Sequence, residues 1–453
     1  MLTLAAAALA AVLLFVRTFR GWIGLSLIGL LAAAAVPRQL VKLEDVPDRT
    51  DITDIATAGP ALSTTSIAIL CMLLITASAT RRERSPLIPR AIPMILPFVL
   101  FCVVAYAFVW PHTPSVRGGI ISLTTALLAW VVGRRFQILL RGNTSALRMV
   151  AGGLLFLFAI EVAVAFTQLA IGITELAGRG AGTFAHPAWL GKYVLVLMPL
   201  LLPLTASDDR RTARLSSIAL MLALVGTALT VARANLLVLI AVILAWSLFR
   251  SYGAGVKSII FRRAGVPLAV ALLSLPFASL VLERFASDPD GGDRTPLLDA
   301  GLRIIALHPL VGTGPNNYVP TARASEAIVF STGYPVHNTF LLGIAELGIF
   351  GLVLFALPVV AAVVTCIGHA RDSDKDTSNT ARAFLITIGG VAIVGLSGWG
   401  FWQDSILQLL FFGAGYAHAK VAPVTVRDTD ALTRSYHASR RNRAFSFPNL
   451  TGD

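Results

Sequence analysis

Charged residues are scarce in this chain. They make up 13% of its 453 residues, whereas an ordinary soluble domain has about 25%. The hydrophobic fraction is 56% and the mean hydropathy is +0.77. So few charged groups cannot cover a water-soluble fold of this length. The deficit excludes a soluble globular domain and indicates that lipid surrounds most of the chain.

Cysteine is scarce as well, and the common ligand-binding motifs are missing. The three cysteines, Cys71, Cys102 and Cys366, lie within apolar stretches, where a thiol behaves as a small hydrophobic group. Their spacing fits neither a metal site nor a disulfide framework, and no nucleotide-binding P-loop or dinucleotide fingerprint occurs. The net charge of +13 is spread between apolar stretches rather than gathered in a patch, so nucleic acid is not expected as a partner.

Long apolar stretches are what the chain has in abundance. About 20 such residues cross the hydrocarbon core as a helix, and continuous rather than alternating apolar sequence favours helices over a β-barrel. We predict an all-α integral membrane protein of about 12 transmembrane helices. The first stretch lacks the charged start of a signal peptide and is counted as a membrane segment. The expected spans are residues 2–16, 21–36, 61–79, 91–110, 118–133, 149–172, 189–206, 215–231, 234–249, 265–282, 338–367, 383–400 and 404–418.

Basic residues mark alternate connections between these spans, and the positive-inside rule makes those connections cytoplasmic. Residues 1–418 are expected to form one membrane domain, followed by a flexible, basic cytoplasmic tail at 419–453. The opposite side then receives the acidic stretch 44–54, the loop 172–188, the break at Arg233 and the longest loop, 283–337. The basic connections contain Arg81, Arg82, Arg84 and Arg90; Arg134, Arg135, Arg141 and Arg148; Arg210, Arg211 and Arg214; Arg250, Lys257, Arg262 and Arg263; and Arg371, Lys375 and Arg382.

Arg233 interrupts an otherwise apolar stretch from Ile218 to Phe249. An arginine at the centre of a membrane helix costs roughly 2.5–3.5 kcal/mol. One interpretation is a turn at the outer surface from which the side chain snorkels to water. The other is an anion ligand, because guanidinium is always charged and binds phosphate bidentately.

The long loop is too apolar to be disordered, and loops beyond about 15 residues are usually functional or disordered. A helix is predicted to begin at Arg294 and to lie on the membrane, with Leu298, Leu302, Ile305 and Ala306 on one face. Farther on, Gly312 and Gly314 permit tight turns and expose amides that can bind an anion. A Gly-x-Gly pair, however, more often marks a turn only.

His337 and Asn338 precede the apolar stretch that follows this loop. Asn338 is a good helix N-cap, which places His337 at a helix N-terminus on the water side. There the imidazole is either an ordinary interfacial residue or a general base, and the positive end of the helix lowers its pKa and keeps it neutral.

Five further polar residues are candidates. His186 precedes a helix that contains Lys192. In one interpretation His186 belongs to a turn and Lys192 snorkels to water, and in the other both residues contact phosphate or sugar. Gln403 and Asp404, at the start of the last span, bind sugar hydroxyls or cap that helix. Glu161 lies at mid-membrane depth, where a carboxylate pairs with an arginine or belongs to a proton path.

The chain resembles the superfamily of O-antigen ligases and polymerases, which are bacterial membrane glycosyltransferases. The resemblance implies a fold of about 12 helices with a large periplasmic or extracellular loop, in the bacterial inner membrane. Ala232 and His186 depart from it, since the family often has serine and asparagine there. The stretches that carry it are Gly182–Pro187, Thr230–Arg233, His308–Tyr318, His337–Leu341 and Ala345–Gly351.

The resemblance also implies a function. A glycan passes from a polyprenyl diphosphate, usually undecaprenyl diphosphate, to a hydroxyl of a glycan or glycolipid acceptor, without a metal or other cofactor. By match, Arg233 and His337 are the catalytic residues, and Arg233 and Arg294 are diphosphate ligands. Arg303 and Lys192 are further diphosphate candidates, because developing charge on the leaving group needs fixed cations. His186, Asn338, Asn316 and Asp404 are candidates for contacts with the acceptor or sugar.

Single displacement predicts inversion at the anomeric carbon, and retained configuration would exclude it. Three alternatives stay open. A polymerase of the same superfamily would extend another lipid-linked chain. A transporter or flippase would carry inverted repeats and broken helices, and no repeat is visible in the sequence. A structural or assembly protein would keep its role after loss of Arg233 and His337.

Overall fold

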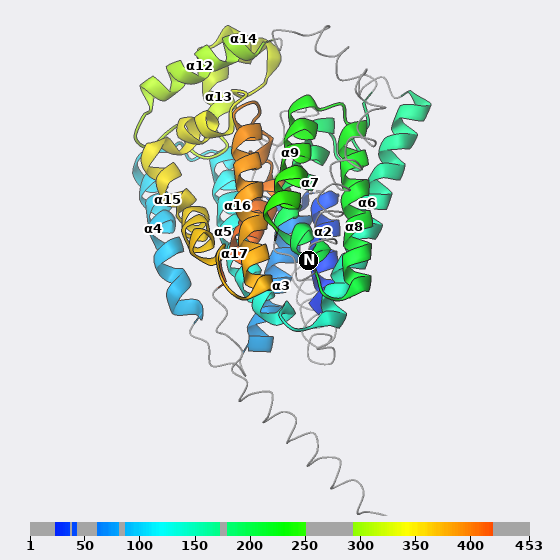
Figure 1. The fold of residues 1–453 in the computed structure, drawn as a ribbon. Coiled ribbons are helices and arrows are strands. Elements are labelled where there is room, and N and C mark those ends of the chain that lie inside the picture. The colour runs from blue at the N-terminus through cyan, green and yellow to red at the C-terminus, as the bar shows by residue number, and fades with distance from the viewer. Residues whose placement is uncertain are drawn as a thin grey trace, which may run out of the picture. The chain divides into compact units, whose positions relative to one another are not determined.

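The computed structural model describes residues 23–36, 39–42, 61–80, 87–172, 179–250 and 293–419, and these are almost entirely helical. The expected spans 2–16 and 265–282, the acidic stretch 44–54 and most of the basic tail lie outside the described residues. Figure 1 shows how the described helices are arranged in the bundle.

Most of the expected spans are found as helices, with ends shifted by a few residues. Within the described ranges, six helices are long and apolar enough to cross a membrane: α5 (Pro114–Leu140), α6 (Thr144–Ile171), α7 (Pro187–Thr205), α8 (Arg210–Leu229), α15 (Thr339–His369) and α16 (Lys375–Gly395). The other bundle helices are α2 (Ile23–Ala35), α3 (Thr64–Thr80), α4 (Leu87–Phe108), α9 (Arg233–Phe249) and α17 (Asp404–His418). The chain is thus a multi-pass helical membrane protein.

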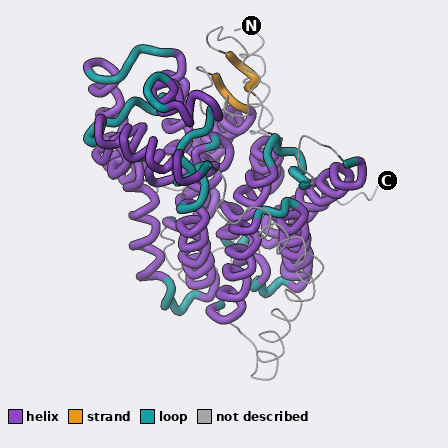
Figure 2. Tube along the Cα trace, turned by 90° about the horizontal axis from the view of Figure 1, so that it is seen from above, coloured by secondary structure: helices purple, strands orange, loops and turns teal. Residues whose placement is uncertain are grey.

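The predicted count of about 12 spans is not confirmed, since the described residues contain six full-length candidate spans. Two expected spans lie outside the described residues. The other five correspond to the shorter apolar helices at Gly24–Ala35, Thr64–Thr76, Ile92–Phe108 and Arg233–Phe249 and to α17, which has 15 residues. In addition, the strands β1 (Gln39–Lys42) and β2 (Ala61–Ser63) pair antiparallel, and Figure 2 shows them side by side.

Ion pairs join three helix connections at one end of the bundle, which we call the basic end. Arg141, after α5, contacts Asp374, before α16, at 3.0 Å. Arg148 of α6 contacts Asp209, before α8, at 3.1 Å, and Lys375 contacts Asp208. The positive-inside rule predicted that these connections lie on the same side of the membrane, and the structure places them at the same end of the bundle.

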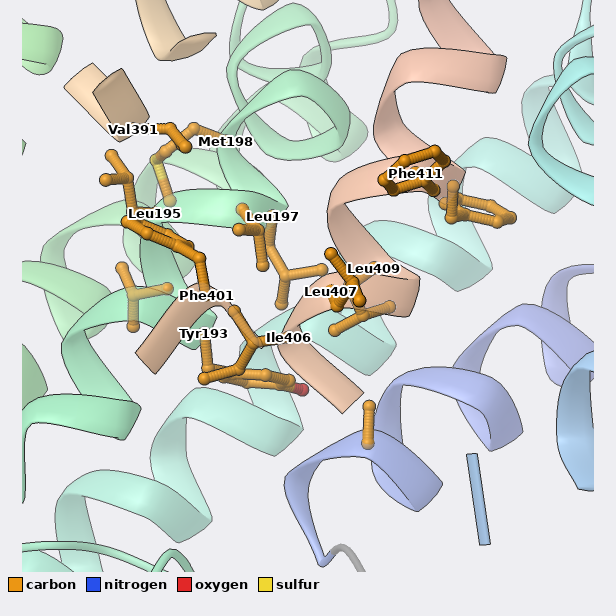
Figure 3. Packing of buried hydrophobic residues seen from close by; sticks show 14 of the residues in the cluster. Tyr193, Leu195, Leu197, Met198, Val391, Phe401, Ile406, Leu407, Leu409 and Phe411 are labelled. Carbon is orange, nitrogen blue, oxygen red and sulfur yellow. The ribbon is translucent and has the colours of Figure 1, made fainter. Parts of the chain in front are cut away.

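Helix α7 forms the centre of the core. Of the residues in its most apolar 18-residue stretch, 89% are buried. Its first turn contains no acidic residue and its last turn no basic residue. Figure 3 shows Tyr193, Leu195 and Leu197 of α7 beside side chains of α16 and α17. A helix that is apolar on all sides is stable only when surrounded by other helices, so α7 is a fixed element on which polar residues can be held.

The loop between α9 and α15 contains α12 (Arg294–Leu307), α13 (Tyr318–Arg323) and α14 (Ala327–Thr332), which lie at the top of Figure 1. The predicted helix at Arg294 is confirmed. Leu297, Ala300 and Ile304 form its buried face, while Leu298 and Leu302 are 37% and 48% exposed. The stripe that the sequence assigned to the membrane is therefore the exposed one.

The amides of Gly312 and Gly314 are not available to an anion. Helix α15 is interrupted at Gly348, where φ is 64° and ψ is 176°, and this break frees carbonyl groups within the helix. The amide of Gly314 donates to the carbonyl of Glu346 at 2.9 Å, and that of Gly312 donates to His308 at 3.1 Å. A Cβ on Gly312 would lie 2.3 Å from the Glu346 carbonyl oxygen, so this segment is a packing motif in which glycine permits close approach.

Candidate functional site

Several connections meet at the end of the bundle opposite the basic end, which we call the histidine end. The start of α15 is joined to the α16–α17 connection, because the Thr339 hydroxyl donates to Gly398 O at 2.6 Å. That connection packs on α7, where a Cβ on Gly400 would lie 3.1 Å from Lys192 Cδ. The segments that carry His337 and Lys192 are therefore held against one shared connection.

Lys192 is a buried cation on the second turn of α7, with 6% of its surface exposed. Its ammonium nitrogen lies 5.9 Å from the centre of the Phe401 ring, a cation–π contact. No carboxylate pairs with Lys192 among the described residues. Burying a charge without a partner is costly, so this position fits a site whose counter-charge is supplied by an anionic ligand.

His337 is held as a neutral base. Its Nδ1 lies 3.2 Å from Pro335 O, and since a carbonyl only accepts, the proton is on Nδ1 and Nε2 carries the free lone pair. Burial is the main cause that lowers its pKa to about 4, followed by the positive charge of Arg294, and Lys192 adds to the effect. The direction agrees with the sequence prediction, but the cause is burial and neighbouring cations.

His186 is the N-cap of α7 and has the opposite tautomer. Its Nδ1 accepts from the amide of Ala188 at 3.1 Å, so the ring proton is on Nε2 and can be donated. Burial lowers its pKa to about 4, and Arg179, Lys192 and His337 contribute in that order. The histidine end thus holds one imidazole that accepts and one that donates.

Four of the predicted site residues therefore lie close enough to one another to interact electrostatically. We call the set of His186, Lys192, Arg294 and His337, with Arg179, the cationic cluster. Arg179 was not singled out from the sequence. Its only signal is that it lies in the loop before α7, a few residues ahead of the motif Gly182–Pro187.

Arg233 begins α9 at the same end of the bundle. The turn before it needs a positive φ of 50° at Val231. Two residues after Arg233, the Asn235 side chain donates to Ala188 O at 2.8 Å, which joins the start of α9 to the start of α7. Arg233 is half-buried there, on the helix next to the one that carries Lys192.

The other candidates have partners of their own. Arg303 forms a bidentate ion pair with Glu326, at 2.9 and 2.6 Å, on the outer face of α12. The backbone amide of Asn316 donates to the Glu346 carboxylate at 2.9 Å. The Asp404 carboxylate accepts from the hydroxyl of Ser122 at 2.6 Å.

Two candidates act as helix caps. The Asn338 side chain caps α15, accepting from Phe340 and Leu341 at 2.9 and 3.1 Å, and Gln403 caps α17, accepting from Ile406 at 3.1 Å. Both interpretations of Gln403 were open from the sequence, and the structure gives capping. Neither residue belongs to the cationic cluster.

The fold and the site define a multi-pass membrane protein with a cluster of cations and neutral histidines at one end of its helices. Residues 193–356 match the family described as O-Antigen ligase, Wzy_C. This segment begins in α7 and contains Arg233, Arg294 and His337. The resemblance predicted from the motifs is confirmed over this segment.

A curated relative agrees with that family. The chain is similar to "Exopolysaccharide production protein ExoQ" of Rhizobium meliloti (strain 1021), with 26% identity over 148 residues. The similar segment covers 30% of this chain and 33% of the relative. The two comparisons thus relate parts of this chain to an O-antigen ligase family and to a protein of exopolysaccharide production.

Proposed function

We propose that this protein transfers a glycan from a polyprenyl diphosphate carrier, such as undecaprenyl diphosphate, to a hydroxyl of a glycan or glycolipid. The observation that carries the proposal is the buried ammonium of Lys192, which lies beside Arg294 and the neutral His337 and pairs with no carboxylate in the described part of the chain. A lipid-linked diphosphate would supply the missing negative charge, and its chain would stay in the membrane. The histidine end would face the outside of the bacterial inner membrane, as the basic residues at the other end favour.

The chemistry is a single displacement at the anomeric carbon. The acceptor hydroxyl gives its proton to Nε2 of His337 while its oxygen forms the new bond. The bond from the anomeric carbon to the diphosphate oxygen breaks, and that electron pair stays on the diphosphate. Lys192, Arg294 and Arg233 would stabilise the charge that develops there, while the Nε2–H of His186 would donate to a donor or sugar oxygen.

Binding and catalysis are coupled through the pKa of His337. In the free protein burial holds this pKa down and the positive charges of Arg294 and Lys192 lower it further, which makes the imidazole a weak base. An anionic diphosphate placed between these cations would offset their charge and raise the pKa. His337 would thus become a better proton acceptor once the donor is bound.

A polymerase is the second candidate, and the name of the relative favours it. An exopolysaccharide is a long chain, so a protein for its production can join repeat units to one another rather than to a different acceptor. In this case donor and acceptor would both be lipid-linked glycans. The same cluster would serve either reaction.

The test is a transfer assay with the full chain reconstituted in lipid vesicles and an undecaprenyl-diphosphate-linked oligosaccharide. Lengthening of the glycan without another acceptor indicates a polymerase, and product only after addition of a second acceptor indicates a ligase. Inverted anomeric configuration is expected. No transfer to any hydroxyl acceptor, together with glycan uptake that survives His337→Ala and Arg233→Ala, would overturn the proposal in favour of a transporter.

A further inference from the structure

Two polar side chains of α6 hold an irregular piece of backbone that the proposed mechanism does not use. Gln168 accepts from the amides of Ala181 and Gly182 at 2.8 and 3.0 Å and donates to Gly182 O at 2.8 Å. Seven residues earlier on the same face, Glu161 accepts from the amide of Thr183 at 2.9 Å. Non-helical backbone at membrane depth is tolerated only where protein satisfies it, and these two residues do so.

The hydrogen bonds around Thr183 determine the protonation of Glu161. The Thr183 hydroxyl oxygen lies 2.6 Å from Glu161 Oε1 and 2.6 Å from Ala35 O. Both distances are those of strong O–H···O bonds, yet a hydroxyl has one proton and the Ala35 carbonyl has none. If Glu161 were ionised, one of the two close contacts would contain no hydrogen. If Glu161 is protonated, it donates to Thr183, and Thr183 donates to Ala35.

No positive charge compensates an ionised Glu161 in the described part of the chain. The side chain is 2% exposed, and its hydrogen-bond partners are the amide and hydroxyl of Thr183. The nearby hydroxyl of Tyr193 donates elsewhere, to Leu31 O at 2.9 Å. An unpaired carboxylate inside a membrane helix is costly, so burial favours the same protonated form.

We propose that Glu161 is a neutral carboxylic acid at neutral pH and a positioning residue. With Gln168 it fixes the backbone of residues 180–183, and thereby sets where Arg179 and His186 lie in the cationic cluster. Gly182 shows how closely the two elements fit, because a Cβ there would lie 2.1 Å from Glu161 Oε2. This role replaces both the ion pair and the proton path suggested by the sequence. Only its effect on catalysis rests on the proposed function.

The protonation state is tested by infrared spectroscopy of the full chain in vesicles at pH 7. The difference spectrum between wild type and Glu161→Gln should show loss of the carbonyl band of a protonated acid, and this band should shift in D2O. Loss of carboxylate bands instead would overturn the proposal. The subtraction matters because other buried carboxyl groups contribute to both spectra.

The positioning role is tested without any activity measurement. A cysteine is placed at the exposed Ala185 in a chain whose three native cysteines are replaced, and its rate of maleimide labelling is measured. Glu161→Leu should speed labelling because the loop is released. Glu161→Gln should not, since its amide donates to Thr183 and its oxygen accepts from the Thr183 amide. Equal labelling in the two variants would overturn the role.

Activity gives the third measurement. Glu161→Leu and Thr183→Val should lower kcat/KM by up to about 100-fold, the effect of a displacement of ~1 Å in a site. Glu161→Gln and Thr183→Ser should restore kcat, KM and the pH profile. Loss of activity in Glu161→Gln with an altered pH profile would mean that Glu161 moves protons. If the first two tests succeed while the wild type transfers no glycan, the proposed function fails and the positioning role stands.

Discussion

The two ends of the helix bundle both carry basic residues but use them differently. Among the described residues at the basic end, three cations have carboxylate partners, in the pairs Arg141–Asp374, Arg148–Asp209 and Lys375–Asp208, and the buried Arg135 donates to the carbonyl of Leu73. At the histidine end Lys192 is more deeply buried than the three paired cations, and no carboxylate among the described residues pairs with it. The two histidines beside it are neutral.

The difference separates two reasons for placing a cation in a membrane protein. Paired, partly exposed cations set orientation and join connections, and each contributes little to stability. A buried cation without a partner lowers stability unless a ligand compensates it, so its presence indicates binding. Mutations at the two ends should therefore have opposite consequences, with loss of activity at one end and small changes of stability at the other.

The largest effect is expected at His337. Replacement by alanine removes the proton acceptor, and general base catalysis contributes typically about 10²–10⁴-fold. We expect kcat to fall by this amount in the glycan-transfer assay while the variant is still produced in the membrane. His369→Ala at the basic end is the matched control, because it removes a histidine in the last turn of α15 that lies outside the cationic cluster. Full activity of His337→Ala would show that the histidine end takes no part in the reaction.

Lys192→Met should have the next largest effect. The variant keeps the apolar length of the side chain and removes only the charge, which is expected to lower kcat/KM by about 10²–10³-fold, as for one oxyanion-stabilising donor. Its thermal stability should be unchanged or higher, because a buried unpaired cation is lost. Lys375→Met at the basic end is the control and should leave transfer intact. A Lys192 variant that is active but unstable would assign this lysine a structural role.

The pH dependence should differ between free and donor-bound protein. The pKa of His337 is about 4, so kcat/KM, which reports the free enzyme, should stay flat from neutral pH downward and fall only near pH 4. The profile of kcat should fall at a higher pH, because the bound diphosphate offsets Arg294 and Lys192. His186→Asn should keep both limbs. A fall of kcat/KM near the ordinary histidine value of about 6.5 would mean that neither burial nor the two cations lower the pKa of His337.

The comparison also shows what the sequence can predict. Apolar length and basic connections were enough to predict most of the helices in the described ranges, and residues 404–418 were predicted with the bounds of α17. The sequence also predicted that Lys192, Arg233, Arg294 and His337 lie on the same side, because basic and non-basic connections alternate along the chain. These properties depend on local composition and on the order of the spans, both of which are visible in one sequence.

What could not be predicted depends on contacts between distant segments. The break at Gly348 uses amides of the Gly312–Gly314 turn, and neither segment by itself indicates the other. Arg303 was a diphosphate candidate because of its charge, but Glu326, 23 residues farther on, folds against it. Likewise, the partners of Glu161 are the amide and hydroxyl of Thr183 in a loop, and that hydroxyl also contacts the Ala35 carbonyl of α2, which no spacing rule indicates.

The smallest effect is expected from the Arg141–Asp374 pair at the basic end. The two side chains are 23% and 41% exposed, and such pairs contribute about 0.2–1 kcal/mol in double-mutant cycles. Arg141→Ala, Asp374→Asn and the double variant should therefore differ little in thermal unfolding, and all three should transfer glycan at the wild-type rate. Asparagine keeps the cap of α16, so the cycle isolates the charge. If Arg141→Ala lost as much activity as Lys192→Met, exposure and pairing would no longer distinguish the two ends.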